Sequence, residues 1–237
     1  MKLKRQKQRN LLLSLVYRLS RLLRALPAET RLRFYLDLEW IFDRLALEES
    51  FRVFTPETHP FRSHSMAFLL GHIHQDDRVL DIGSNRGEMS ALLAKHCKEV
   101  IGIEVEETLV REAAGRYPAA NLHFVHTEGR EYLEREDTVF DVILLSHVIE
   151  HLDAPADLLE LVRRRARHVY IEVPDFERNY LNQYRLACGS QLIYADEDHV
   201  WEFDRNEVRT LIAASGLEIL EEDCRFGVVR VWCRGQA

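Results

Sequence analysis

The sequence has little of what defines several large classes of protein. Its four cysteines, Cys97, Cys188, Cys224 and Cys233, show no C-x-x-C spacing. Neither a zinc nor a disulfide framework is therefore indicated, and a reducing cytoplasm is the expected location. No apolar run approaches the length of a membrane span. Internal repeats and low-complexity segments are also absent from the 237 residues, a length that fits one α/β domain with extensions.

Negative charge dominates the chain except at its beginning. The formal net charge is −7, but residues 1–33 hold ten Lys or Arg and one acid, Glu29, which gives +9. The other residues hold 22 basic and 38 acidic side chains, which gives −16. Because the main body is acidic, we expect no nucleic acid among its partners.

A basic amphipathic helix is predicted over about residues 11–26. Its apolar positions recur at helical spacing and its arginines interleave with them: Leu12, Leu15, Val16, Leu19, Leu22, Leu23 and Leu26, with Arg18, Arg21 and Arg24. Such a helix suits an anionic membrane surface, or packing on the domain or a partner. The arginines argue against a secretory signal. Two more helices are expected, over about 29–47 and 63–74.

From Asp77 onward, apolar strand patterns alternate with helical ones. Strands are predicted at 78–82, 99–104, 121–125, 139–145, 168–173, 217–222 and 227–233, with helices near 88–96, 107–116, 156–166 and 205–215. This alternation predicts an α/β fold with a doubly wound, mostly parallel seven-stranded sheet of Rossmann-like type. Only a short turn separates the last two strands, so the last strand should be antiparallel.

The segment 78–90 predicts a ligand cradle of the strand–turn–helix type. Gly83 and Gly87 follow the apolar strand and allow backbone N–H groups to approach a ligand. Ligands of such sheets lie beyond the carboxyl ends of the strands. Two acids fit this place: Glu104 could accept from a ribose diol, and Glu128 from an exocyclic amine. A further polar segment, Ser146 to His151, follows the next apolar strand.

A nicotinamide-binding fold would share the turn and the strand-end acid. That fold, however, requires a G-x-G-x-x-G fingerprint, and this sequence lacks the third glycine of that fingerprint. The ordered set of motifs instead resembles class I S-adenosylmethionine-dependent methyltransferases, over roughly residues 77–225. The segments that carry the resemblance are Asp81-Ile-Gly83-Ser84-Asn85-Arg-Gly87, Glu104, Glu128, Phe140 to Leu152, His199-Val-Trp-Glu-Phe203 and Ala214-Ser-Gly-Leu-Glu218.

The resemblance implies S-adenosylmethionine as the cofactor. The matching positions that would bind it are Asp81, Gly83, Ser84, Asn85, Gly87, Glu104, Glu128 and Ser146. Asn85 stands where the family has its middle glycine, and Glu128 where it usually has Asp. The methyltransferase domain would then occupy residues 61–237, after an N-terminal helical extension over residues 1–60.

Methyl transfer from a sulfonium needs positioning in a dry cleft, and a hydroxyl acceptor must also lose its proton. His147 is the first candidate for the base, because it lies just past a strand end and histidine titrates near neutrality. The alternative is that His147 only shapes the pocket or hydrogen-bonds the loop. His199 is a second candidate catalytic residue, and it could alternatively close the pocket or anchor its loop. Glu150 and His151 are expected to orient the backbone.

A metal is not expected, although His147-x-x-Glu150-His151 has the spacing of an inverted zinc-protease motif. A protease is rejected, because the motif falls where the methyltransferase pattern places such residues. Ubiquinone-pathway O-methyltransferases carry a similar metal-binding E-x-x-E-H segment. His147, Glu150 and His151 therefore remain weak metal candidates, without a recognisable further ligand.

The acceptor is expected to be a small molecule. The chain lacks the Asn/Asp-Pro-Pro-Tyr/Phe motif of amino-methylating relatives, which disfavours adenine and glutamine-amide substrates. Aromatic residues after the fifth strand could line an acceptor pocket or pack locally: Tyr180, Tyr184, Tyr194, Trp201 and Phe203. The expected reaction is O-methylation of a sugar, lipid-linked glycan or quinone-like acceptor. The alternatives are a nicotinamide-dependent oxidoreductase and a non-catalytic scaffold held through the basic helix at a membrane or partner.

Overall fold

The computed structural model describes residues 11–55 and 57–237, which form two compact units. A helical unit contains residues 11–47 and 181–193, and a sheet unit contains the other described residues. The predicted boundary at residue 60 stays a prediction. The first stretch of the helical unit ends at Leu47, and residues 181–193 belong to the same unit. Among the described residues, no helix combines the length and apolar content needed to cross a bilayer.

The helical unit is built around the first part of one long helix. Its elements are α1 (Leu11–Ser20), the 3-10 helix η1 (Arg21–Ala25), α2 (Ala28–Val53, continuing into the sheet unit) and α8 (Leu181–Ala187). The helix expected over 11–26 therefore tightens to 3-10 geometry after Ser20. The guanidinium of Arg31 donates to the carbonyls of Arg24, at 3.1 Å, and Leu26, at 2.7 Å, so α2 is tied to the turn before it.

A buried arginine joins α8 to α2. Arg185 is 1% exposed and donates to Asn182 Oδ1 at 2.7 Å, to the Leu36 carbonyl at 3.0 Å and to the Glu39 carboxylate. Ser190 adds a hydrogen bond to Asp37. The sequence analysis did not predict α8, because its packing depends on polar partners about 150 residues away rather than on an apolar stripe.

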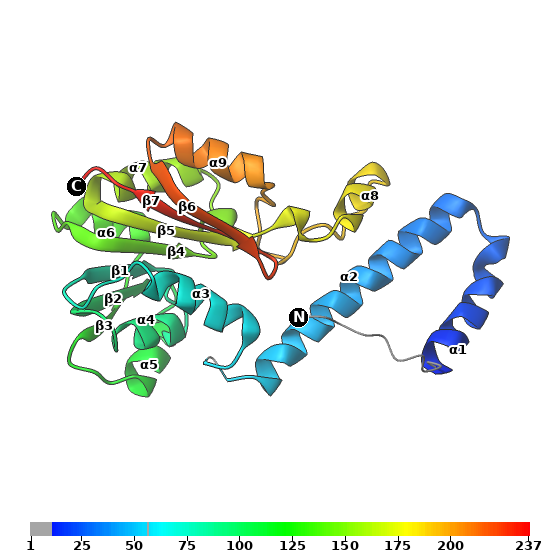
Figure 1. Cartoon of the computed structure of the whole chain (residues 1–237), viewed down its shortest axis with the longest axis horizontal. Helices are drawn as coiled ribbons and strands as arrows, with labels where there is room; N and C mark the ends of the chain where they lie inside the picture. Colours follow the sequence, from blue (N-terminus) through cyan, green and yellow to red (C-terminus); the bar gives the residue numbers. More distant parts are fainter. Residues whose placement is uncertain (1–10, 56) are drawn as a thin grey trace. The chain divides into compact units, whose positions relative to one another are not determined.

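The sheet unit has the predicted doubly wound fold (Figure 1). Its strands are β1 (Arg78–Ile82), β2 (Glu99–Glu104), β3 (Leu122–His126), β4 (Phe140–Ser146), β5 (Ala166–Pro174), β6 (Glu218–Arg225) and β7 (Val228–Arg234). They lie in the order β3-β2-β1-β4-β5-β7-β6. The first five are parallel, and β7 is antiparallel to both β5 and β6. The predicted fold class, including the antiparallel last strand, is confirmed.

Helices cover both faces of this sheet. They are α3 (Pro60–Leu70), α4 (Glu88–Leu93), α5 (Glu107–Arg116), α6 (Gly129–Arg135), α7 (Pro155–Arg165) and α9 (Arg205–Ala214), with 3-10 turns η2 (Ile149–His151) and η3 (Phe176–Arg178). One core cluster joins α6, α7 and α9 to side chains such as Leu80, and the other joins α3 and α4 to side chains such as Val79. Successive strand residues thus point to opposite faces and are buried on both.

A buried carboxylate links the elements of this core. Glu172 on β5 is 1% exposed and lies in register with Arg230 on β7, which is fully buried. The Arg230 guanidinium is 2.8 Å from Glu172 Oε2. The same oxygen accepts from the hydroxyls of Ser65, at 2.6 Å, and Tyr170, at 2.7 Å. Burial would raise the pKa of Glu172, but nearby cations and hydrogen-bond donors hold that pKa below its ordinary value.

We expect Glu172→Gln to destabilise the fold by about 3–5 kcal/mol, because it removes the carboxylate nearest to the buried Arg230 charge and leaves Asp223 as its acidic partner. Urea unfolding measures the change. Glu218→Gln is a matched control, since it breaks an exposed cross-strand pair with Arg234 and should cost less than about 1 kcal/mol. Equal, small losses in both variants would contradict a structural role for the buried pair.

Candidate functional site

The predicted site residues follow neighbouring strands at one edge of the sheet. Ile82, the last residue of β1, lies in register with Ile103 of β2 and Leu145 of β4. The Gly83–Gly87 turn, Glu104 and Ser146 are therefore brought together at the carboxyl ends of three adjacent strands. This is the place where the strand order reverses, and it is where ligands of such sheets bind.

Both glycines of the turn have backbone conformations that other residues rarely adopt. Gly83 has φ 77° and Gly87 has φ 74°. A Cβ on Gly83 would lie 2.8 Å from Val148 Cγ2, and one on Gly87 would overlap the Phe124 ring. Packing thus adds a second reason for these glycines to the predicted approach of a ligand to the backbone.

Asn85, at the position of the missing middle glycine, adopts a backbone conformation that glycine adopts readily. Its φ of 48° lies in the left-handed region, which asparagine tolerates better than most residues. Its side-chain Oδ1 accepts from the Arg86 N–H at 2.8 Å, and its own N–H donates to Glu104 Oε2 at 3.0 Å. The irregular position of the motif is therefore stabilised by local hydrogen bonds.

Glu104 clamps the turn to the end of β2. Its carboxylate is 9% exposed and also accepts, through Oε1, from the N–H groups of Val105, at 2.8 Å, and Glu106, at 3.0 Å. Three backbone donors thus fix the orientation of the carboxylate at the strand end. Its predicted contact with a ribose diol stays a prediction.

Two buried polar groups lie beside the glycine turn. Asp81 is 2% exposed and accepts from the Ser90 hydroxyl. Burial, with a smaller contribution from the Glu104 charge, raises the pKa of Asp81 to about 6, although the Ser90 hydrogen bond opposes the shift. Ser84 is 6% exposed, and its hydroxyl oxygen has no hydrogen-bond partner within the described residues. A buried hydroxyl without a partner is destabilising, and a ligand would relieve it.

Glu128 begins a helix that the sequence analysis did not predict. It is exposed, and its carboxylate accepts from the N–H groups of Arg130, at 3.3 Å, and Glu131, at 3.2 Å, which makes it the N-cap of α6. An acidic residue before the helical segment Gly129–Arg135 is the signal that would have revealed this cap. A contact between Glu128 and an adenine amine stays a prediction.

His147 turns the chain sharply after β4. It has φ 55°, and its N–H donates to the Glu172 carbonyl at 2.8 Å. Its ring lies between two buried carboxylates, with Nδ1 3.1 Å from Glu150 Oε1 and Nε2 3.5 Å from Glu172 Oε1. Ser146 also donates to Glu172 Oε1, at 3.0 Å. Glu172 was missed in the sequence, although an acid within the apolar strand Val169 to Val173 was the available signal.

These carboxylates change the charge expected for His147. Burial would lower the pKa of the ring, but the hydrogen bonds and charges of Glu150 and Glu172 outweigh it and raise that pKa to about 10. His147 is therefore a cation at neutral pH and has no lone pair with which to accept a proton. This geometry favours the alternative in which His147 shapes the loop.

Two of the three weak metal candidates, Glu150 and His151, come together with a further residue, whereas His147 is not part of that group. His147 is engaged by two carboxylates and does not share a helix face with His151. The structure instead places donor atoms of Glu150, His151 and His199 within 4.8 Å of one another. His151 Nδ1 lies 3.2 Å from the Asp198 carbonyl.

His199 lies inside its loop. Its side chain is 5% exposed, and Nδ1 lies 2.7 Å from Glu202 Oε1. The ring also meets His151 edge-on, with the ring centroids 4.7 Å apart. These contacts favour the expected anchoring role, and a catalytic role for His199 stays a prediction.

The aromatic residues after β5 differ in their surroundings. Phe203 is buried and belongs to the core, and the Trp201 ring stacks on it. Trp201 Nε1 donates to the Leu152 carbonyl at 2.9 Å, which connects this loop to the segment after β4. Tyr180 and Tyr194 are exposed. An acceptor pocket lined by these residues stays a prediction.

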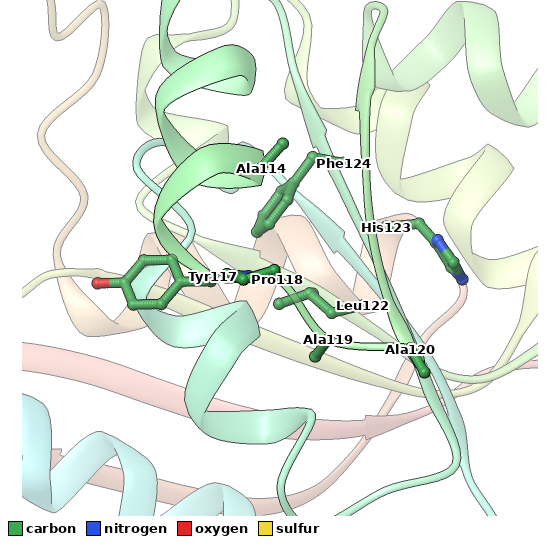
Figure 2. A pocket seen from close by; sticks show the side chains of 8 residues that line it. All are labelled: Ala114, Tyr117, Pro118, Ala119, Ala120, Leu122, His123 and Phe124. Atoms are coloured by element: carbon green, nitrogen blue, oxygen red, sulfur yellow. The ribbon is translucent and has the colours of Figure 1, made fainter.

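A surface groove of about 540 Å³ lies elsewhere on the sheet unit (Figure 2). It is formed by the end of α5, the loop after it and the first residues of β3. Its lining residues are Ala114, Tyr117, Pro118, Ala119, Ala120, Leu122, His123 and Phe124. None of the predicted site residues lines this groove, but Phe124 lines it and also lies beside Gly87 of the candidate site.

The two carboxylates should make the stability contribution of His147 depend on pH. The folded pKa of about 10 lies above the ordinary value of 6.5, so the contribution is complete below about pH 6.5 and is lost as the pH rises towards 10. We expect the difference in unfolding free energy between the unaltered chain and His147→Gln to shrink across this range. Urea unfolding at several pH values measures it, and an NMR titration of the ring gives the pKa directly. A difference that is constant with pH would contradict the ion pairing.

Comparison with known proteins gives this site a family. A family model described as "Methyltransferase domain" matches residues 57–222. A protein-L-isoaspartate O-methyltransferase from Nitrosospira multiformis is 34% identical over 111 residues, which are 46% of each chain. A ubiquinone biosynthesis O-methyltransferase from Pseudoalteromonas translucida is 25% identical over 113 residues, 47% of this chain and 48% of the relative. The chain thus spans about half the length of the curated relatives it matches.

Solved structures share the fold. Magnesium protoporphyrin IX methyltransferase from Synechocystis, solved with bound S-adenosylhomocysteine, superposes with a TM-score of 0.57 at 15% identity, over 73% of this chain and 81% of that one. An S-adenosylmethionine-dependent methyltransferase from Archaeoglobus fulgidus gives 0.55 at 20% identity, over 72% and 91%. The family model covers more than half of the chain and includes the glycine turn, Glu104 and the Ser146–His151 segment. The chain therefore belongs to the family of S-adenosylmethionine-dependent methyltransferases.

Proposed function

We propose that this protein transfers the methyl group of S-adenosylmethionine to a hydroxyl of a small molecule. A sugar, a lipid-linked glycan or a quinone-like compound is the acceptor class we favour. The observation that carries the proposal is the cradle at the strand ends. Its turn from Gly83 to Gly87 contains residues in the left-handed region and is held by a hydrogen bond to Glu104. The buried Ser84 hydroxyl in this turn has no hydrogen-bond partner among the described residues.

The residues of the cradle fit the chemical groups of this cofactor. Ser84 offers a buried hydroxyl, and the glycine turn brings backbone close to a ligand without an intervening Cβ. Asp81 is a buried acid, and a ligand ammonium near it would favour its charged form. Glu104 presents a fixed carboxylate for paired hydroxyls. When bound, the cofactor supplies an activated methyl group, and its transfer removes the sulfonium charge.

The chain's own contribution is then mainly positioning. Glu172 and Glu150 hold the His147 loop in one conformation beside the cradle. Because the His147 imidazolium is protonated at neutral pH, we assign it the role of a fixed cation that shapes the acceptor side. Deprotonation of a hydroxyl acceptor at pH 7 would fall to another group or to water, and a well-oriented acceptor gains most of its rate from proximity.

Ser84→Ala gives a test in which stability and binding change in opposite directions. Without ligand, removing the unpartnered hydroxyl should leave the unfolding free energy unchanged or raise it by up to about 1 kcal/mol. With S-adenosylhomocysteine, losing one hydrogen bond should weaken binding about tenfold. Calorimetric titration measures the affinity, and urea unfolding measures the stability.

Ser63→Ala is the matched control, since Ser63 is exposed on α3 and, among the described residues, its hydroxyl bonds to the Pro60 carbonyl within its own helix. It should bind S-adenosylhomocysteine like the unaltered chain. Equal affinity in Ser84→Ala would remove Ser84 from the site. A folded chain that binds nicotinamide dinucleotide and not S-adenosylhomocysteine would overturn the proposed function.

The acceptor class is tested by transfer of a radiolabelled methyl group to a panel. The panel contains free and lipid-linked glycans, catechol-type quinone precursors and a peptide with an isoaspartyl residue. We expect label in a glycan or phenol hydroxyl. Label in the peptide carboxyl alone would show an isoaspartate O-methyltransferase activity like that named for the Nitrosospira relative and would exclude a hydroxyl acceptor.

A further inference from the structure

The first helix of the chain presents an uncovered apolar face. Five residues of α1, which we call the leucine face, are each at least 53% exposed: Leu11, Leu12, Leu15, Val16 and Leu19. At about 100° per residue they occupy an arc of roughly 140° on one side of the helix. No residue of α1 is buried by the described part of the chain. Apolar surface of this extent on one element marks a binding face.

The contacts that attach this segment to α2 lie elsewhere. Arg31 donates to backbone carbonyls at the end of η1, and the Tyr35 hydroxyl lies 3.5 Å from the Ser20 carbonyl. These are polar contacts with the backbone at and after the end of α1. They leave the leucine face available to an occupant from outside the described chain.

Charge identifies the kind of occupant. Arg18, Arg21 and Arg24 lie within or just after α1, and residues 1–33 carry +9 while the rest of the chain carries −16. An anionic surface would attract the N-terminal segment and repel the body. Two copies of the segment, by contrast, would bring like charges together, which disfavours self-association through this face.

We propose that the α1–η1 segment lies in the interface of an anionic lipid bilayer and holds the protein at its surface. The leucine face enters the boundary between headgroups and acyl chains, and the arginines reach back to lipid phosphates along their aliphatic stems. The inference rests on the N-terminal segment alone and does not depend on the acceptor proposed above.

Co-sedimentation of the full chain with phosphatidylcholine vesicles, with and without phosphatidylglycerol, tests this. We expect at least tenfold tighter binding to the anionic vesicles, and loss of that preference at high salt. The double substitution Leu15→Glu and Leu19→Glu should lower the affinity at least tenfold. Replacing Arg18, Arg21 and Arg24 with Gln lowers the charge of residues 1–33 from +9 to +6 and should reduce the preference for anionic lipid.

A matched control adds the same two negative charges at exposed apolar positions outside α1. Val53→Glu with Leu220→Glu changes residues that are 73% and 40% exposed, and this variant should bind vesicles like the unaltered chain. All variants should keep their affinity for S-adenosylhomocysteine, which shows that the domain is folded. Equal binding to both vesicle types, or full binding by the Leu15/Leu19 variant, would overturn the proposal. A chain that does not bind vesicles but dimerises through the leucine face would also overturn the proposal.

Discussion

The rest of the sheet unit depends on one buried cross-strand pair, Glu172 with Arg230. A carboxylate and a guanidinium are stable in this core because they pair with each other and because further groups complete both shells: Ser65 and Tyr170 donate to Glu172, and Asp223 Oδ2 lies 3.2 Å from Arg230 Nη1. The pair also specifies register. Shifting β7 by one residue against β5 would turn the Arg230 side chain to the other face of the sheet and remove its contact with Glu172. The polar pair thus defines the register of β7 on β5, which apolar side chains alone would leave ambiguous.

The two oxygens of Glu172 have different partners, one set in the core and the other beside the candidate site. Oε2 receives the core donors, whereas Oε1 faces Ser146 and His147 in the loop after β4. The position of that loop is therefore set by the same group that fixes the β5–β7 pairing. Because the carboxylate is held from both sides, the His147 loop is positioned before any ligand arrives, and such preorganisation is what a reaction dominated by positioning requires.

The sequence allowed prediction of what is local and periodic. All seven strands and the glycine turn follow from short apolar runs and the turn residues between them, whereas the left-handed backbone of Asn85 was not predicted. The pair of Glu172 and Arg230 could not be predicted, because it joins residues far apart whose neighbours look like ordinary strand residues. The charge of His147 was missed for the same reason: isolated histidine titrates near neutrality, and only the fold places two carboxylates around it.

The candidate site is bounded by two turns built on the same principle. β1 and β4 lie side by side, and each is followed by a non-glycine residue in the left-handed region, Asn85 and His147. Such conformations persist only where their surroundings impose them. In both turns the constraint comes from a residue on the next strand outward, through its side chain in one turn and through its backbone in the other. Glu104 of β2 accepts from the Asn85 N–H, and the carbonyl of Glu172 on β5 accepts from the His147 N–H. The crevice where the strand order reverses is therefore closed on each side by a strained turn held by a neighbouring strand. That arrangement explains why the residues that depart from simple strand and glycine patterns are concentrated there.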